Sequence, residues 1–155
     1  MERPSAANDF QVGHVRLLLS SFRHFVGRSL IDEDGNDVEA ARQVFCAPFV
    51  VLSHDAQPDP VLTYGNKAAL KLWQTDWDTL TSMPSRLTAE PVHRDERRRL
   101  LEGADKQGYI ENYTGIRISA NGKRFQIEGA IIWTLIDAMG KRVGQAATFD
   151  RYRFL

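Results

Sequence analysis

The chain has 155 residues, of which 43% are hydrophobic and 26% are charged, a balance typical of one folded domain with its own core. Lysine plus arginine and aspartate plus glutamate number 20 each, so no net charge draws the chain to nucleic acid or to an anionic membrane surface, and neither partner is expected. The one cysteine, Cys46, excludes an internal disulfide framework and favours a reducing compartment such as the cytoplasm, and no apolar run of about 20 residues predicts a membrane span.

Residues 1–47 are expected to form an N-terminal helical segment. Apolar side chains recur every three or four residues between residues 8 and 28, the spacing of an amphipathic helix: Val15, Leu18, Leu19, Phe22, Phe25 and Val26. An acidic loop with Gly35 follows, and Asp37 is expected to cap a second short helix that ends before Pro48. The apolar stripe of the first helix needs a surface to pack on.

The main domain, residues 48–155, is predicted to open with a hairpin of two strands. Its apolar runs, 49–52 and 61–64, are separated by a proline-rich turn. Asn66 comes next, directly before the helix-forming run 67–70, where its side chain can accept a hydrogen bond from an unpaired backbone N–H. Asn66 is therefore expected to cap the helix.

Short helices and loops are predicted to continue from there to a charged helix over residues 94–106. Gly108 is suited to end this helix because glycine tolerates a positive φ. The run Arg97-Arg98-Arg99 is interleaved with acidic residues, which is typical of a solvated helix face.

Three antiparallel strands are expected to complete the domain. The first covers residues 110–118, and Asn121-Gly122 is the strongest short signal for a hairpin. The last covers 143–149, after a turn over 137–140. In the middle strand, regular alternation places six residues on one face: Phe125, Ile127, Gly129, Ile131, Trp133 and Leu135.

This order of elements resembles a PAS domain, and several short motifs resemble the PAS-related MEKHLA domain family. The motifs are Ser53-His54-Asp55, Gln57-Pro58-Asp59-Pro60, Tyr64-Gly65-Asn66-Lys67-Ala68-Ala69, Pro84-Ser85-Arg86, Ala89-Glu90-Pro91 and Gly144-Gln145-Ala146-Ala147-Thr148-Phe149. The resemblance implies an α+β fold with a five-stranded antiparallel sheet of order 2-1-5-4-3, small helices on one face and an extra N-terminal amphipathic helix. It also implies that Asn66 is the asparagine by which PAS domains join the second strand to the first helix.

The same resemblance implies a pocket between the sheet and the small helices. The candidates for its lining are Tyr113, Phe125, Ile127, Trp133, Gln145 and Phe149. Gln145 is expected to point inward, and a buried glutamine needs hydrogen-bond partners. Either it bonds to a side chain such as Tyr113 or to the backbone and holds the core together, or it orients a small ligand.

No cofactor is identified from the residues, and flavin and haem are both disfavoured. A PAS-type flavin photosensor needs a cysteine in an Asn-Cys-Arg run, which the chain lacks, since Cys46 precedes the first strand. Haem needs an axial ligand, and His93 lies in a polar context typical of a surface histidine. His54-Asp55 is explained by a turn after a strand, and neither a metal site nor a catalytic residue is predicted.

Three functions stay open. The first is a non-catalytic sensory, signalling or protein-interaction module of PAS type, with an unknown small molecule as its ligand. The second is a small α+β pocket enzyme of the isomerase or dehydratase type, and the third is a purely structural dimerisation module. A homodimer is expected, in which Val15, Leu18, Phe22 and Phe25 pack on the outer face of the sheet, formed by Ala130, Ile132, Ile136 and Ala146, and against their copies.

Overall fold

The structure, a computed structural model, describes residues 1–33 and 35–155. The acidic loop expected around Gly35 therefore lies partly outside the described residues. In chain order the elements are η1 (Ala6–Gln11), α1 (Val12–Val26), α2 (Asp37–Cys46), β1 (Val50–Asp55), β2 (Leu62–Gly65), α3 (Lys67–Trp73), α4 (Trp77–Leu80), η2 (Ser85–Thr88), α5 (Pro91–Gln107), β3 (Tyr109–Ile118), β4 (Arg124–Ile136), β5 (Arg142–Phe149) and β6 (Arg151–Phe154).

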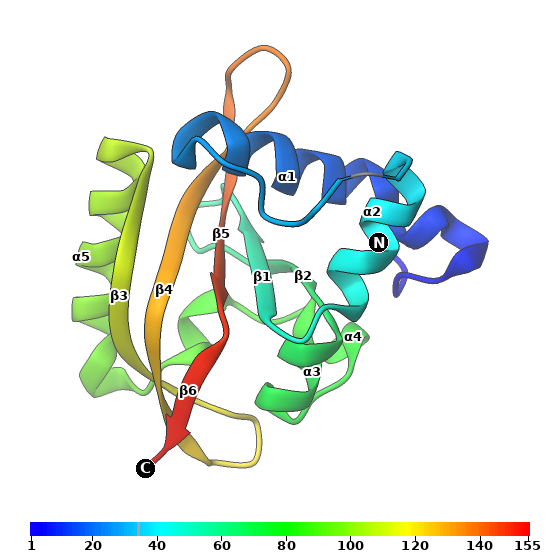
Figure 1. Cartoon of the computed structure of the whole chain (residues 1–155). Helices are drawn as coiled ribbons and strands as arrows, with labels where there is room; N and C mark the ends of the chain where they lie inside the picture. The colour runs from blue at the N-terminus through cyan, green and yellow to red at the C-terminus, as the bar shows by residue number, and fades with distance from the viewer. Residues whose placement is uncertain (34) are drawn as a thin grey trace.

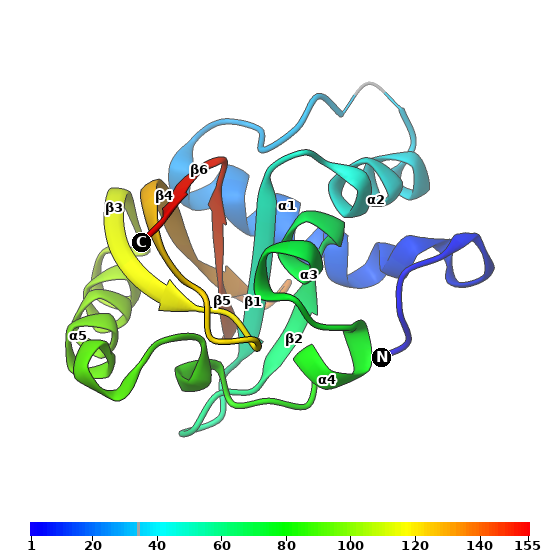
Figure 2. The ribbon, with the colours of Figure 1, turned by 90° about the horizontal axis from the view of Figure 1, so that it is seen from below.

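An antiparallel sheet forms the centre of the molecule, between two helical layers (Figure 1). Its strands follow the order β2-β1-β5-β4-β3, which confirms the predicted order. A sixth strand, β6, was not predicted; it pairs with the start of β4, where β5 has already ended. Figure 2 shows α3 and α4 beside β1 and β2, and α5 along β3.

Helix α1 covers the other face of the sheet, as its apolar stripe predicts. Val15, Leu18 and Phe22 are buried there against β4. The indole of Trp133 donates a hydrogen bond to the Leu18 carbonyl at 3.2 Å, and its ring meets the edge of Phe22 at 4.9 Å between centroids. Ser21 adds two bonds to the backbone of β4. The contact between α1 and the sheet is thus both apolar and directional.

A bulge at Gly129 corrects the predicted alternation of β4. Gly129 has a φ of +64°, and β4 carries one more residue than β3 between the pairs Ala130 to Tyr113 and Ile127 to Gly115. Such an extra residue reverses the side to which later side chains point. Phe125 and Ile127 face the helices α3 and α5. After the bulge, the prediction that alternate residues of 125–135 continue on this same face is wrong. Ala130 and Ile132 face these helices, while Ile131, Trp133 and Leu135 face α1.

Asn66 joins three elements. Its Oδ1 accepts hydrogen bonds from the N–H of Ala69, at the start of α3, and of Val51, in β1, at 3.1 and 3.0 Å. Its Nδ2 donates to the carbonyl oxygens of Val44, in α2, and Phe49. The side chain is fully buried, so Asn66 is the N-cap of α3 and also the point at which α2 and β1 are attached.

No helix within the described part of the chain has the length and apolar character needed to cross a membrane.

Candidate functional site

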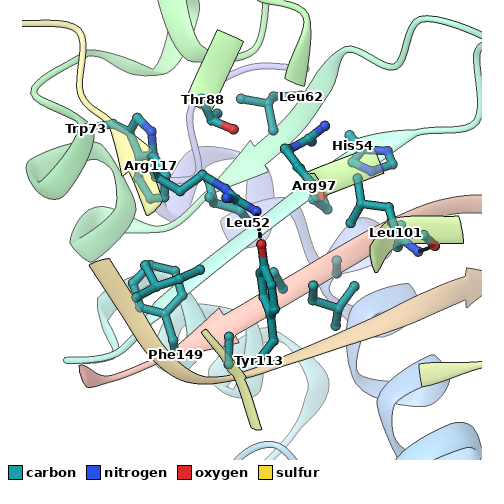
Figure 3. Close-up of a pocket in the computed structure, with 17 residues that line it drawn as sticks. Leu52, His54, Leu62, Trp73, Thr88, Arg97, Leu101, Tyr113, Arg117 and Phe149 are labelled. Carbon is teal, nitrogen blue, oxygen red and sulfur yellow. Dashed lines mark hydrogen bonds between the residues drawn. The ribbon is translucent and has the colours of Figure 1, made fainter. Parts of the chain in front are cut away.

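A small cavity of about 60 Å³ lies between the sheet and the layer formed by α3, η2 and α5 (Figure 3). Strands β1 to β5 supply its floor, β2 through Leu62 alone, and the helices close it. Its lining consists of Leu52, Ser53, His54, Leu62, Trp73, Thr88, Arg97, Leu101, Tyr113, Arg117, Ile127, Ala130, Ile132, Gln145, Ala146, Ala147 and Phe149.

Most of this lining is apolar. Leu52, Ala147 and Phe149 come from the paired central strands β1 and β5, and Ile127 and Ile132 come from β4. Alternation brings Ala147 and Phe149 to one face because side chains two residues apart point the same way, and the bulge at Gly129 brings Ile127 and Ile132, five residues apart, to that face as well. Burying the apolar part of a ligand against this lining would therefore be energetically favourable.

Arg117 brings a positive charge into this apolar space. Its side chain is only 7% exposed, and its Nη2 donates to the hydroxyl of Tyr113 at 2.9 Å, a bond drawn in Figure 3. Its Nη1 donates to the carbonyl of Ile116 at 2.8 Å. Gly115 lies between the two on the same face, and a Cβ there would stand 2.3 Å from the Tyr113 hydroxyl, so the missing side chain allows this pair to form.

Arg97 brings a second positive charge, from α5. Its Nη2 donates to the hydroxyl of Ser85 at 3.0 Å. Burial, together with the nearby charge of Arg117, lowers the pKa of Arg97 to about 10. The prediction of a solvated face for Arg97-Arg98-Arg99 therefore holds for Arg98 and Arg99, which are exposed, but is wrong for Arg97.

Two buried acceptors face the same region. Gln145 is 1% exposed; its Nε2 donates to the Leu101 carbonyl and to Asp105, whereas its Oε1 has no hydrogen-bond partner among the described residues. The structure thus gives Gln145 a backbone partner, but not Tyr113.

His54 lies opposite Gln145 on β1, in the strand itself and not in the expected turn. Burial is the largest cause that lowers the pKa of its imidazole; the charges of Arg97 and Arg142 act in the same direction, whereas its interactions with the Asp55 carbonyl and the Gln145 side chain act in the opposite one. Nδ1 lies 2.8 Å from the Asp55 carbonyl, which can only accept, so Nδ1 carries the hydrogen of the neutral ring. Nε2 is then an acceptor, and no described residue donates to it.

The structure brings together four of the six residues expected to line a pocket: Tyr113, Ile127, Gln145 and Phe149. Phe125 lies on the same side of the sheet but packs behind the ring of Trp73, at 5.0 Å between centroids. Trp133 faces α1 on the opposite side, because the bulge at Gly129 reverses its direction.

Sequence reasoning missed the three cationic or basic residues of the lining. His54 follows Val50 and Leu52 with the spacing of a strand face, and Arg117 follows Tyr113 in the same way, so alternation alone would have found both. Arg97 carries no such signal, because the direction of one residue in a charged helix depends on how the helix docks.

Comparison with known proteins gives one family and one fold. The model of the MEKHLA domain family matches residues 12–154. None of the curated proteins compared with the chain matches it.

Among solved structures, the chain is similar to the PAS domain of a protein from Colwellia psychrerythraea, with a TM-score of 0.65 at 14% identity over 76% of this chain and 94% of that one. It is also similar to a light-oxygen-voltage domain studied with a flavin analogue, with a TM-score of 0.59 at 16% identity over 79% and 86% of the two chains. An RNA-binding light-oxygen-voltage receptor gives a TM-score of 0.64 at 16% identity, over 78% of this chain and 34% of that one. At such identities these similarities show the fold alone.

The residues of the cavity do not fit a flavin. The volume of about 60 Å³ is far below the ~300 Å³ or more of sites that enclose a drug-sized ligand. No cysteine lines the cavity, and Cys46 is exposed at the end of α2. No group of three or more His, Cys, Asp or Glu side chains that could hold a metal ion occurs in residues 1–33 and 35–155.

Proposed function

The chain belongs to the MEKHLA domain family, of PAS-type sensory domains, and from this premise we propose that it is a non-catalytic sensory module that binds a small molecule in its cavity. The bound molecule would bias the packing of α1, on the other side of the sheet. We place the protein in the cytoplasm, in line with its single cysteine.

One observation carries this proposal. Neighbouring residues of β4 serve the two faces of the sheet: Ile132 lines the cavity, while Trp133 packs on α1 and donates to the Leu18 carbonyl. A shift of β4 by a ligand therefore has a direct route to α1, because packed elements respond to such shifts as discrete units.

The two other functions receive less support. A pocket enzyme of this type needs an acid and a base within reach of its substrate; His54 lines the cavity and could act as a base, but no aspartate or glutamate of the described residues lines the cavity to complete such a pair. A purely structural dimerisation module does not require a buried positive charge, whereas this cavity contains one at Arg117.

We also propose a homodimer, but with a changed interface. Val15, Leu18 and Phe22 are buried within one chain, and Phe25 is half-buried beside Gly108, so the stripe is already covered. A dimer through residues 10–28 would use the outward side of α1. A native mass spectrum of freshly purified protein measures both the oligomeric state and any retained ligand; a monomer would contradict this part of the proposal.

Coupling between the cavity and α1 is tested by filling the cavity. Ala147→Val adds volume to the lining of the cavity, and we expect it to change hydrogen–deuterium exchange of the α1 amides in the full chain. Ala56→Val, in the exposed turn after β1, is the matched control and leaves this exchange unchanged. If a folded Ala147→Val protein exchanges in α1 as the unaltered chain does, the proposed coupling is wrong.

A further inference from the structure

We propose that the ligand of the cavity is a short hydroxycarboxylate anion, with its carboxylate on Arg97 and Arg117 and its hydroxyl directed to His54 and Gln145. This inference rests on the proposed function for the location of the ligand, and it adds the chemical class. It is argued from charge, from unpaired acceptors, from size and from access.

The charge of the cavity is positive and uncompensated. Arg97 and Arg117 both line it, and neither forms an ion pair with any described carboxylate. Their partners are neutral oxygens of Ser85, Tyr113 and Ile116. Two guanidiniums carry about ten N–H donors in total, so these bonds leave most of them unused. A carboxylate supplies both the missing negative charge and acceptors of the right shape.

The unpaired acceptors demand a donor. His54 Nε2 and Gln145 Oε1 are buried without a partner in the described part of the chain, and the two residues stand opposite each other on β1 and β5. A simple carboxylate cannot donate a hydrogen bond to either acceptor, because it only accepts. A hydroxyl group donates one hydrogen bond and so satisfies one of these acceptors.

The size of the cavity limits the rest of the molecule. A volume of about 60 Å³ corresponds to about four to six heavy atoms, at ~10–15 Å³ for one water-sized group. Leu52, Ile127 and Phe149 would surround its apolar part. A two- or three-carbon hydroxy acid such as glycolate or lactate meets these limits.

An access route exists beside the arginines. An open cleft between the β1–β2 turn and α5 shares four residues with the cavity: His54, Arg97, Leu101 and Gln145. Three of the four carboxylates of the cleft are already paired with arginines: Asp59 with Arg86, Asp95 with Arg98 and Asp105 with Arg142; the fourth, Glu102, has no ion-pair partner among the described residues. Among the described residues Arg97 has no ion-pair partner, and it lies where the cleft meets the cavity, in a position to receive an anion.

Titration calorimetry of the full chain at pH 7 tests the proposal, with sodium lactate as the probe. We expect saturable binding of lactate, binding of propionate weaker by about tenfold or more because it lacks the hydroxyl, and none of the uncharged lactamide. Inorganic phosphate at equal or higher affinity would show a general anion site and overturn the carboxylate assignment.

Variants locate the bound anion. Arg117→Gln and Arg97→Gln are each expected to weaken lactate binding by about tenfold or more, whereas Arg99→Gln, exposed on the same helix, is expected to leave it unchanged. Gln145→Leu is expected to reduce the preference for lactate over propionate. If Arg117→Gln does not fold, Arg97→Gln alone decides, because its side chain is only half-buried. Unchanged binding in Arg97→Gln would overturn the proposal.

Failure of this inference is distinguishable from failure of the proposed function. If no hydroxycarboxylate binds but Ala147→Val still alters exchange in α1, the chemical class is wrong and the sensory coupling stands. If lactate binds through Arg97 and Arg117 without any effect on α1, the class is right and the coupling is wrong.

Discussion

Asn66 makes more bonds than a helix cap requires. A capping side chain accepts one hydrogen bond from the first turn of its helix, whereas Asn66 makes four, to groups in or next to α2, β1 and α3. Because the side chain is fully buried, water cannot replace these bonds if it is removed. Asn36, which caps α2, makes a single such bond from an exposed position.

The substitution Asn66→Ala is therefore expected to lower the free energy of unfolding by about 3 kcal/mol or more, since the N–H groups of Val51 and Ala69 lose this acceptor and the carbonyls of Val44 and Phe49 lose this donor, of which Val44 keeps only a long bond from the Ala47 N–H, at 3.4 Å. Asn36→Ala, the matched control, is expected to lower it by ~1 kcal/mol, the usual cost of a lost cap. Urea denaturation measures both values. Equal losses of unfolding free energy in the two variants would mean that Asn66 acts only as a helix cap.

His14 makes the stability of the protein depend on pH. Its Nε2 lies 2.9 Å from the Ser53 hydroxyl, its ring stacks on Tyr64, and burial lowers its pKa from 6.5 to about 4. The unfolded chain therefore binds a proton at a higher pH than the folded one. Stability contributed by neutral His14 is fully present above about pH 6.5 and is lost as the pH falls toward 4.

We expect this loss to reach about 3 kcal/mol between pH 7 and pH 4, from the size of the pKa shift. His54, whose pKa is also lowered, acts in the same direction. In His14→Gln the decline should therefore become shallower without disappearing, and His24→Gln, at an exposed position on the same helix, should leave it unchanged. Denaturant unfolding at several pH values measures the slopes; the same slope in His14→Gln and in the original chain would contradict this origin.

At the scale of the element, strand β4 depends on one glycine. Gly129 has a φ of +64°, a region that costs other residues ~1–2 kcal/mol, and the guanidinium of Arg151 lies where a Cβ would be. Gly129→Ala is expected to lower the free energy of unfolding by about this amount. Gly103→Ala makes the same chemical change inside α5, where nothing lies within 4 Å, and is expected to raise it by up to ~1 kcal/mol.

Thermal unfolding measures the stability of both variants. A loss of stability in Gly129→Ala and a gain in Gly103→Ala would identify the backbone conformation of Gly129, and not the added methyl group, as the cause of the loss. A Gly129→Ala protein as stable as the original would mean that β4 does not need the bulge.

Helix α1 is expected to be essential for a soluble sheet. Burying Val15, Leu18 and Phe22 contributes ~1.5–3 kcal/mol each before the loss of entropy, and deletion of residues 1–30 would expose the apolar face around Trp133. The truncated chain is therefore expected to aggregate or to lose stability. Light scattering and thermal unfolding measure both; a truncated chain that remains a well-behaved dimer of unchanged stability would contradict this role of α1.

At the scale of the whole molecule, local patterns predicted the fold well. The strand order, the amphipathic α1 and the position of Asn66 at the start of α3 all follow from periodicity, turn residues and the family resemblance. The periodicity of α1 and the cap at Asn66 lie within short stretches of chain, so the sequence alone contains them, whereas the strand order was implied by the family resemblance and by no local pattern. The boundary between a helical segment and a main domain near residue 48 stays a prediction.

The candidate site was harder to predict because it depends on single residues in three dimensions. Nothing in the sequence says that Gly129 takes a positive φ, and this one angle moves Trp133 out of the cavity and Ile132 into it. In the sequence Arg97 cannot be distinguished from its exposed neighbours Arg98 and Arg99, because its inward direction depends on how α5 docks on the sheet. Strand β6 pairs with residues 125–128 of β4, the part of β4 that β5 does not pair with, and no local sequence pattern shows this.

The contact between α1 and β4 also dictates when the protein can fold. The hydrogen bond from Trp133 to the Leu18 carbonyl joins residues 115 positions apart, so α1 leaves the ribosome long before its partner strand is made. At translation rates of ~5–20 residues per second, the wait is roughly 6 to 23 s. During that time the apolar stripe of α1 has no sheet to cover, and contacts of such long range also form slowly. The apolar stripe of α1 is therefore expected to be open to non-native contacts during synthesis until β4 has been made.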